Sequence, residues 1–502
     1  MELDLKMQIS VFDGTEKIKI NKPIRLIELF AGYGSQHLAL KYLGVKCESW
    51  KICEWAVKSI QAYKDMHFKD DNTDYSKDHS IEFIINRLVK WGISANYNEH
   101  MTKEQIKRMG ESKARQIYNN IKATHNLVNV QQAHAEDLEI VDRDKYTYMM
   151  TYSFPCQDLS KAGLGKGMEK GSGTRSGMLW EVERILDEAK EIGTMPHILL
   201  MENVPDVIGS NNIKHFAQWL AKLESLGYKC YWQVLNAKDY GVPQNRERCF
   251  MVSVLGDYWF AFPKGKKLEI KLKDILENEV DEKYYLSDRM LAYCTDMTNR
   301  NGFVRGERFN PIDTEKKDYG YAVTTSAGQR PTDNFIIIKG KEHEITKDNE
   351  NYIEWKQKGL LDSDCRAWKE NKVAGTITTN GKTKVAENLK TQLCNELIAS
   401  GKVKENDVIR HSYSNSRMKD WQTRGCETNN ISPTLDTRCD CLGVVRNFRI
   451  RKLTPKECFR LMGVRDEDFS RVAENQSNAS LYHLAGDSIV VDVLMAIFKE
   501  ML

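Results

Sequence analysis

Between residues 24 and 256, short apolar runs alternate with stretches of helical periodicity. This alternation limits the possible folds more than any other feature of the chain. The clearest apolar runs cover residues 24–29, 146–151, 197–201 and 249–255. Such alternation is typical of a parallel sheet with helices on both faces. We therefore predict an α/β fold whose ligand site lies at the carboxyl ends of the strands.

A cysteine follows closely after one of these predicted strands. The run 146–151 leads into Phe154-Pro155-Cys156-Gln157, where the proline cannot continue the hydrogen-bonded ladder. Cys156 should therefore lie in a loop at a strand end. A lone cysteine is most often a small buried side chain. A thiol whose pKa is lowered is instead a nucleophile.

A glycine turn follows the first predicted strand. Gly32 and Gly34 permit a tight turn and let a ligand approach the backbone. Glu54 ends a second mixed strand about 20 residues later, where nucleotide-binding α/β folds place the acid that binds ribose hydroxyls. With His37 at the third glycine position, this pattern alone fits a nicotinamide nucleotide as well as S-adenosylmethionine.

Two further polar motifs lie at strand ends. Glu202-Asn203-Val204 follows the run 197–201, and Gln244-Asn245-Arg246-Glu247-Arg248 precedes the run 249–255. Together with the glycine turn and the Pro-Cys-Gln step, they form a set that resembles the cytosine-5 DNA methyltransferase family. The closing motif, Leu484-Ala485-Gly486-Asp487-Ser488, resembles the end of the same family.

The resemblance covers three parts of the chain and implies a domain organisation. The matching parts are residues 24–64, 133–256 and 446–502. The implied fold is a Rossmann-like, S-adenosylmethionine-dependent methyltransferase domain made from 1–256 and 446–502. A mostly β target-recognition domain, 257–445, is inserted before the chain returns to the catalytic domain.

The resemblance also implies a mechanism on a cytosine that has left the DNA helix. Cys156 attacks carbon 6 of the ring and makes carbon 5 nucleophilic. Glu202, if protonated, serves nitrogen 3 and Arg246 meets oxygen 2. Arg248 is expected to support the loop or to bind a phosphate.

The remaining site residues are implied in the same way. The residues expected to contact S-adenosylmethionine are Phe30, Gly32, Gly34, Glu54, Trp55, Asp137, Leu138, Pro155, Asp487 and Ser488. Those expected to contact the DNA substrate are Gln157, Ser160, Arg175, Asn203 and Gln244. No metal is expected. Trp55 could equally be a core aromatic residue.

Two features depart from the family pattern. The family usually has asparagine at the position of Asp487. A carboxylate side chain there would be repelled by the carboxylate of the cofactor. Residues 65–128 also form an insert between Glu54 and Asp137, with an amphipathic stripe at 81–89 and a helix from Thr102 to about Ile121. The basic residues of the insert could contact the DNA backbone or simply form a solvated face.

The middle domain contains a weak internal repeat of predicted strand–turn–strand units. Residues 322–325, 376–379 and 433–437 each precede an apolar extended run. Basic residues in or near the turns are expected of a domain that recognises bases in a DNA groove, although any solvated β surface shows such residues. They are Arg330, Lys382, Lys384, Arg410, Arg417, Lys419, Arg424 and Arg438.

Composition narrows the class of protein. The net charge is only +3, from 74 basic and 71 acidic residues, so a DNA-binding surface must be local. Twelve irregularly spaced cysteines suit a reducing cytoplasm, and Cys439 and Cys441 make a poor metal pair. No stretch reaches 18 apolar residues, so we expect no membrane association.

We therefore expect a cytoplasmic, monomeric DNA cytosine-5 methyltransferase of bacterial or phage type. Its partner is double-stranded DNA, with a cognate restriction endonuclease as a conceivable second partner. A tRNA cytosine-5 methyltransferase is an alternative, but the long middle domain favours duplex DNA. A catalytically idle DNA-binding module is disfavoured by the intact Cys156, Glu202 and Arg246. A nicotinamide oxidoreductase is disfavoured as well, because hydride transfer does not require the Pro-Cys-Gln motif.

Overall fold

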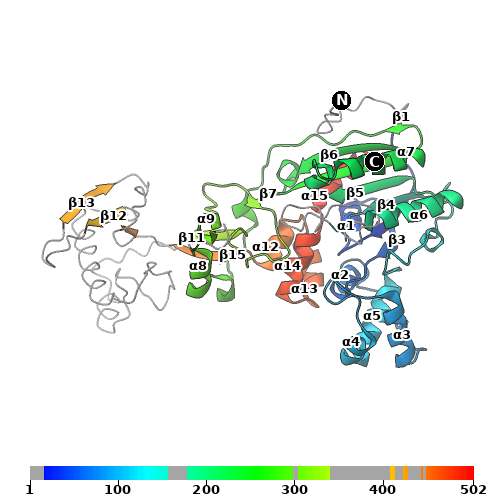
Figure 1. Cartoon of the computed structure of the whole chain (residues 1–502), viewed down its shortest axis with the longest axis horizontal. Helices are drawn as coiled ribbons and strands as arrows, with labels where there is room; N and C mark the ends of the chain where they lie inside the picture. Colours follow the sequence, from blue (N-terminus) through cyan, green and yellow to red (C-terminus); the bar gives the residue numbers. More distant parts are fainter. Residues whose placement is uncertain are drawn as a thin grey trace. The chain divides into compact units, whose positions relative to one another are not determined.

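The computed structural model describes most of the chain (Figure 1). The described residues are 16–155, 178–296, 298, 304–339, 408–412, 422–427, 442–444 and 448–502. Two compact units divide the chain. The first comprises Met1–Asn278, Lys317–Gln329 and Leu453–Leu502, and the second comprises Glu279–Lys316 and Arg330–Lys452.

This division differs from the expected boundaries of 257 and 445. Residues 257–278 and 317–329 belong to the first unit, partly because β10 (Gly320–Tyr321) pairs with β7 (Gln244–Asn245). Residues 446–452 belong to the second unit, because β15 (Phe448–Lys452) pairs there with β11 (Phe335–Lys339). Backbone pairing, which local composition does not reveal, sets these limits.

The first unit contains a six-stranded sheet, as the α/β pattern predicts. The strand order is β3-β2-β4-β5-β8-β6. The strands are β2 (Ile24–Leu29), β3 (Cys47–Cys53), β4 (Thr147–Tyr152), β5 (Ile198–Asn203), β6 (Tyr228–Asn236) and β8 (Glu247–Leu255).

The α/β fold is confirmed, but the sheet is mixed and not purely of the parallel type that the alternation suggests. β3, β2, β4 and β5 are parallel, but β8 is antiparallel to both of its neighbours. The connection from β6 to β8 is short and contains the 3₁₀ turn Ala237–Tyr240. A short connection joins antiparallel strands, whereas a parallel pair needs a long crossover.

Both faces of the sheet are covered. Helices α6 (Leu179–Glu191) and α7 (Ile213–Ser225) pack on one face in an apolar core. Glu28, on the other face of β2, is completely buried and accepts a hydrogen bond from the backbone of α1 (Ser35–Tyr42). Helix α1 in turn packs against α15 (Val491–Lys499).

The C-terminal helices return to the first unit as expected. They are α12 (Pro455–Arg460), α13 (Asp466–Ala473), α14 (Asn478–Asp487) and α15. Thr454 and Glu457 form the capping box of α12, with Pro455 at its first position. The segment Asn478–Lys499 is long and apolar enough to cross a membrane, but most of its apolar stretch is buried within the protein, as in ordinary core helices.

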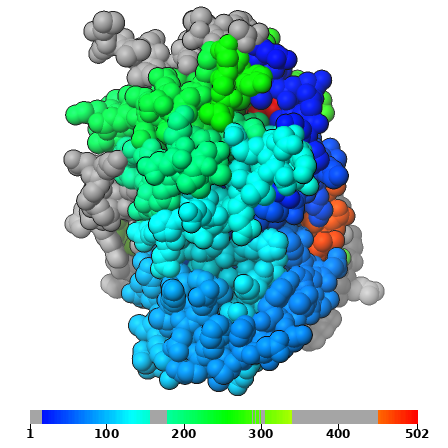
Figure 2. Space-filling view, turned by 90° about the vertical axis from the view of Figure 1, so that its right-hand side faces the viewer, coloured from blue at the N-terminus to red at the C-terminus, as the bar shows by residue number. Residues whose placement is uncertain are grey.

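The insert is a small helical layer with a core of its own. It contains α3 (Ile81–Trp91), α4 (Lys103–Arg108) and α5 (Glu111–Ala123), and it occupies the lower part of the face in Figure 2. The capping box at Thr102 is confirmed. The expected single helix is divided at Gly110, whose φ of 85° cannot continue an α-helix.

The second unit is described mainly as strands. β11 (Phe335–Lys339) is antiparallel to β15, and β12 (Val408–Ser412) lies between β13 (Gln422–Glu427) and β14 (Leu442–Val444). Two short helices, α8 (Asp288–Cys294) and α9 (Arg305–Arg308), precede them. The expected apolar strands at 335–338 and 442–445 are thus largely confirmed.

Several other predictions lie outside the described residues. They are the repeat units at 376–379 and 433–437, the basic residues Lys382, Lys384, Arg417, Lys419 and Arg438, and the pair Cys439 and Cys441. Near the start of the described residues, β1 (Glu16–Lys17) pairs in parallel with β9 (Tyr258–Trp259).

The buried Glu28 makes stability depend on pH. Burial raises its pKa to about 7, despite hydrogen bonds from Tyr63 and the backbone of His37. In the unfolded chain the pKa is about 4.3. The protonated carboxyl therefore stabilises the fold fully below pH 4, and this stabilisation is lost as the pH rises through 7.

We expect Glu28→Gln to remove this loss, because the amide remains uncharged. Relative to the variant, the wild type should lose about 3 kcal/mol of unfolding free energy between pH 4 and pH 8. Urea denaturation at a series of pH values measures the difference. Glu104→Gln, at an exposed position of α4, should retain the wild-type profile. Parallel profiles for wild type and Glu28→Gln would contradict the assignment.

Candidate active site

The glycine turn between β2 and α1 has an unusual backbone. Phe30, Gly32 and Gly34 all have positive φ angles, of 61°, 57° and 81°. Gly34 is also sterically required. A Cβ atom there would overlap with Nε2 of His67 and lie 2.6 Å from Cε2 of Tyr63. The rings of Tyr63 and His67, both on α2 (Val57–His67), therefore pack directly against the turn at Gly34.

Glu54 is fixed beside this turn. Its carboxylate accepts hydrogen bonds from Gly32 N at 3.0 Å and from Ala56 N at 2.8 Å. Burial raises its pKa to about 7, and the nearby Asp487 carboxylate adds to this effect. The structure thus brings Glu54, the glycine turn and the closing motif together, as the sequence predicts.

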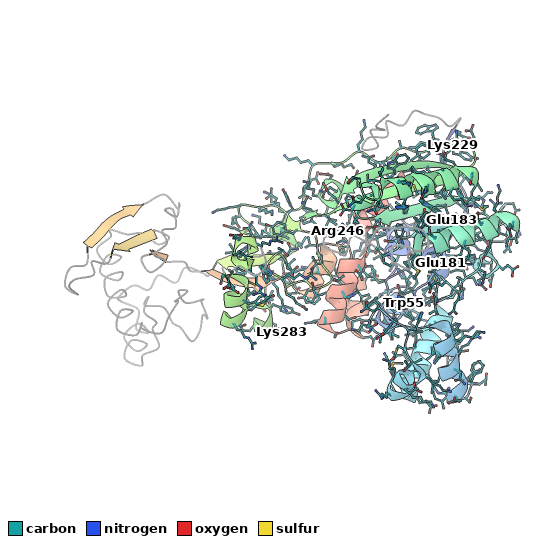
Figure 3. All side chains as sticks on the ribbon, viewed as in Figure 1. Trp55, Glu181, Glu183, Lys229, Arg246 and Lys283 are labelled. Carbon is teal, nitrogen blue, oxygen red and sulfur yellow. The ribbon has the colours of Figure 1, made fainter. Side chains whose placement is uncertain are left out.

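The other expected cofactor residues have varied surroundings. Trp55 is half-buried and its ring lies edge-on to His100, with ring centroids 5.1 Å apart (Figure 3). Asp137 is exposed, and its carboxylate accepts from the backbone N of His134. Leu138 is buried, and its carbonyl accepts from the Trp50 indole.

The carboxyl ends of β4 and β5 bring polar groups together. Ser153 donates from Oγ to Oε2 of Glu202 at 2.5 Å, and Arg248 Nε lies 3.1 Å from Oε1 of the same carboxylate. The Asn203 amide donates to the carbonyl of Phe154 at 3.0 Å, just before Pro155. Glu202 is therefore held beside the segment that leads into Cys156. Cys156 itself lies outside the described residues, with Gln157, Ser160 and Arg175.

The two arginines of the Gln-x-Arg-x-Arg motif have different surroundings from those expected. Arg246 is 4% exposed and donates to the carbonyl oxygens of Val323, Gly486 and Ser488, each at 2.9 Å (Figure 3). Arg248, and not Arg246, lies beside Glu202. A buried cation that binds three carbonyls organises the backbone, whereas the Arg248 cation is paired with a carboxylate.

Gln244 also binds backbone groups. Its side-chain amide donates to the carbonyl of Leu461 at 2.5 Å and accepts from Val323 N at 2.9 Å. Gln244 is completely buried. These contacts give it a positioning role, in contrast to the direct substrate contact expected from the sequence.

The closing motif lies at the same end of the sheet. Ser488 is buried, and its hydroxyl donates to the carbonyl of Leu484 at 2.6 Å. Asp487 has a half-exposed side chain and lies 3.1 Å from Nδ1 of His483. A Cβ atom at Gly486 would lie 2.3 Å from Thr325 N, so this glycine permits close backbone packing.

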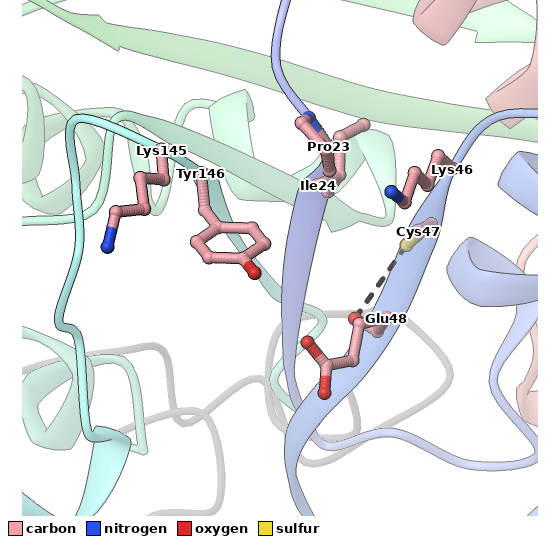
Figure 4. Close-up of a pocket in the computed structure, with 7 residues that line it drawn as sticks. All are labelled: Pro23, Ile24, Lys46, Cys47, Glu48, Lys145 and Tyr146. Atoms are coloured by element: carbon pink, nitrogen blue, oxygen red, sulfur yellow. Dashed lines mark hydrogen bonds between the residues drawn. The ribbon is translucent and has the colours of Figure 1, made fainter.

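A separate cavity of about 380 Å³ lies at the opposite edge of the sheet (Figure 4). Its lining residues are Pro23, Ile24, Lys46, Cys47, Glu48, Lys145 and Tyr146. They precede or begin β2, β3 and β4, so the cavity is at the amino ends of these strands. It does not belong to the candidate active site.

The site thus combines a glycine turn, a buried acid next to it and a second carboxyl beside an arginine, all at the carboxyl edge of an open α/β sheet. These features define a Rossmann-like methyltransferase fold with a place for a nucleoside cofactor. The family described as C-5 cytosine-specific DNA methylase matches residues 92–502, and the chain belongs to this family. The membership predicted from the motifs is confirmed, and the protein is a DNA cytosine-5 methyltransferase enzyme.

Individual relatives agree with this assignment. The chain is 37% identical over 305 residues to the orphan methyltransferase M.SssI of Spiroplasma monobiae, covering 58% of this chain and 75% of that protein. It is 29% identical over 484 residues to the type II methyltransferase M2.ScrFI of Lactococcus lactis subsp. cremoris, covering 95% and 99%.

A solved structure shares the fold. The Entamoeba histolytica methyltransferase EhMeth aligns over 96% of this chain and 98% of its own, with a TM-score of 0.51 and 13% identity. At this identity the likeness concerns the fold alone.

The support beneath the glycine turn can be tested with two matched variants. Gly34 precedes α1 and Gly44 follows it; both have positive φ, but nothing lies within 4 Å of a Cβ at Gly44. Gly44→Ala should cost about 1 kcal/mol of unfolding free energy from backbone strain alone. Gly34→Ala should cost about 2 kcal/mol more, because the added methyl displaces His67 and Tyr63. Equal losses in urea denaturation would show that the rings do not support the turn.

Proposed function

We propose that this enzyme methylates carbon 5 of a flipped-out cytosine at a specific site in duplex DNA, through a covalent bond between Cys156 and carbon 6. The observation that carries the proposal is the position of Glu202. Its carboxylate is held between Ser153 and Arg248, at the strand ends next to the segment that leads into Cys156. An acid and a cation at this point suit an electron-poor ring under nucleophilic attack.

In this scheme each side chain promotes or stabilises one chemical change in the cytosine ring. The thiolate of Cys156 bonds to carbon 6, and carbon 5 becomes an enamine carbon that takes the methyl group. A base such as water then removes the carbon 5 proton, and the bond between carbon 6 and the Cys156 sulfur breaks to release the thiolate. Glu202 in its protonated form donates to nitrogen 3. Since Arg248 is the arginine beside Glu202, we assign to it the positive charge that meets oxygen 2. The base leaves the helix at a cost of a few kcal/mol.

The residues around the glycine turn fit S-adenosylmethionine. When bound, this cofactor supplies an electrophilic methyl group on a sulfonium. Each carboxylate oxygen of Glu54 accepts one backbone N–H and retains lone pairs for ribose hydroxyls. Trp55 offers a ring face nearby. The residues proposed to complete the pocket are Phe30, Gly32, Gly34, Asp137, Leu138, Pro155, Asp487 and Ser488.

The DNA partner is proposed to be read by the second unit, with phosphate and base contacts from its basic residues. Gln157, Ser160 and Arg175 are proposed to contact the DNA, while Asn203 and Gln244 position the backbone around the site. A cytoplasmic monomer remains our proposal. The relatives are named both as orphan and as type II methyltransferases, and we propose a cognate restriction endonuclease as a second partner.

The covalent step can be trapped. Fluorine at carbon 5 cannot leave as a cation, so an adduct that forms with 5-fluorocytosine does not resolve after methyl transfer. Duplex DNA with 5-fluorocytosine at the target should form an irreversible complex with the protein only when S-adenosylmethionine is present. Denaturing electrophoresis detects it. Cys156→Ser should abolish the complex because serine is a weaker nucleophile, while DNA binding is retained.

Each other outcome supports a different conclusion. A trap on fluorinated tRNA but not on DNA would assign the protein to the tRNA-acting enzymes. Tight DNA binding with no adduct on either would favour an idle module. A trap that persists in Cys156→Ser would mean that another residue is the nucleophile.

The division of roles between the arginines gives a second test. Arg248→Met removes the cation beside Glu202, and we expect kcat at saturating substrates to fall about 100-fold. Arg246→Met should instead lower the unfolding free energy by about 3 kcal/mol, because three carbonyl groups lose a charged donor. Steady-state kinetics and denaturation separate the two effects. A fully stable but inactive Arg246→Met would return the catalytic role to Arg246.

A further inference from the structure

We propose that the helical insert, residues 65–128, is part of the cofactor site: its two ends fix the backbone around Glu54, and its Tyr97 forms a wall of the pocket together with His483. This inference rests on the proposed use of S-adenosylmethionine. It gives the insert a role in cofactor binding in place of the DNA contacts or the purely solvated face considered from its sequence.

The carboxyl end of the insert holds Glu54 directly. The side chain of Asn126 accepts from Glu54 N at 3.0 Å and donates to the carbonyl of Glu54 at 2.9 Å. Leu127 N donates to the carbonyl of Ile52 at 2.8 Å, so this segment extends the edge of β3. Asn126 is buried. These paired bonds fix the backbone position from which the Glu54 carboxylate reaches the glycine turn.

A second segment of the insert binds the other side of the same stretch. Ser94 N donates to the carbonyl of Trp55 at 2.8 Å, and the carbonyl of Ser94 accepts from Val57 N at 2.8 Å. Ser94 is completely buried, and its hydroxyl donates to the carbonyl of Glu99. The stretch from Glu54 to Val57 is therefore held by hydrogen bonds to two separate segments of the insert.

Tyr97 lies in the loop that follows Ser94 and has a strained backbone. Its φ of 63° is in the left-handed region, which costs about 1 kcal/mol for a residue with a side chain. The hydroxyl is 3.1 Å from Oγ of Ser59. Burial raises the Tyr97 pKa, and the carboxylates of Glu54 and Asp487 raise it further. The tyrosine is therefore within electrostatic reach of both acids of the candidate cofactor site.

The opposite partner of Tyr97 comes from the closing motif. The rings of Tyr97 and His483 are stacked, with centroids 4.1 Å apart and an angle of 12° between their planes. His483 lies one helical turn before Asp487, and its Nδ1 is 3.1 Å from the Asp487 carboxylate. The aspartate that replaces the usual family asparagine thus has a histidine partner, and the insert contacts that histidine. The positive φ of Tyr97 is a strained backbone conformation. Such strain persists where several surrounding contacts hold the residue in place, and it is often found at ligand sites.

The test compares cofactor binding by variants of the full-length enzyme. Tyr97→Ala should raise the dissociation constant for S-adenosylmethionine about tenfold, because the stacked wall is lost. The affinity for DNA should not change, because Tyr97 lies beside the cofactor site and not in the second unit. Phe83→Ala is the matched control, because Phe83 is an aromatic residue of the same insert that is 45% exposed on α3. It should bind the cofactor as the wild type does.

His483→Ala examines the same contact from the other side and decides the question if Tyr97→Ala does not fold. It should raise the dissociation constant similarly, and the double variant should be little worse than either single one, since both remove one contact. Wild-type affinity in a folded Tyr97→Ala or His483→Ala variant overturns the proposal. If the wild type itself binds no S-adenosylmethionine in calorimetry, the proposed function fails instead.

Discussion

The buried guanidinium of Arg246 is the interaction on which the active-site end of the catalytic unit depends. It donates to carbonyl oxygens of Val323, Gly486 and Ser488, which come from two other regions of the chain. A buried charge is costly unless it is well bonded. All three segments must therefore be present together for the cation to be satisfied. This explains why residues 317–329 cluster with the catalytic unit although the strand–turn–strand pattern placed them in the recognition domain.

The cofactor end of the unit is organised by close packing and by hydrogen bonds to backbone. The glycine turn rests on Tyr63 and His67, and Glu54 is bonded to the turn on one side and to Asn126 on the other. These contacts fix the positions of the groups around the turn, which is the kind of preorganisation that lowers the cost of binding a ligand. The insert contributes to this order through the two hydrogen bonds between Asn126 and the backbone of Glu54.

At the carboxyl ends of β4 and β5, the candidate active site is organised by contacts between polar side chains. Glu202 receives a hydroxyl donor from Ser153 and a cation from Arg248, and Asn203 fixes the carbonyl of Phe154. Neighbouring parallel strands end here, so their terminal residues meet although they are far apart in sequence. The arrangement concentrates polar groups at the carboxyl ends of β4 and β5, next to the segment that leads into the proposed nucleophile.

The sequence by itself determined the α/β class, the family, the strand ends that carry the motifs, and the meeting of Glu54 with the glycine turn. Prolines, glycines and apolar runs act locally, so these features are visible without a fold. Only the tertiary structure decided which arginine meets Glu202. Residues 246 and 248 are two positions apart, and a period-2 pattern gives both the same face. The antiparallel β8, the limits of the two compact units and the contact between Tyr97 and His483 likewise depend on pairing between distant segments, which no local pattern records.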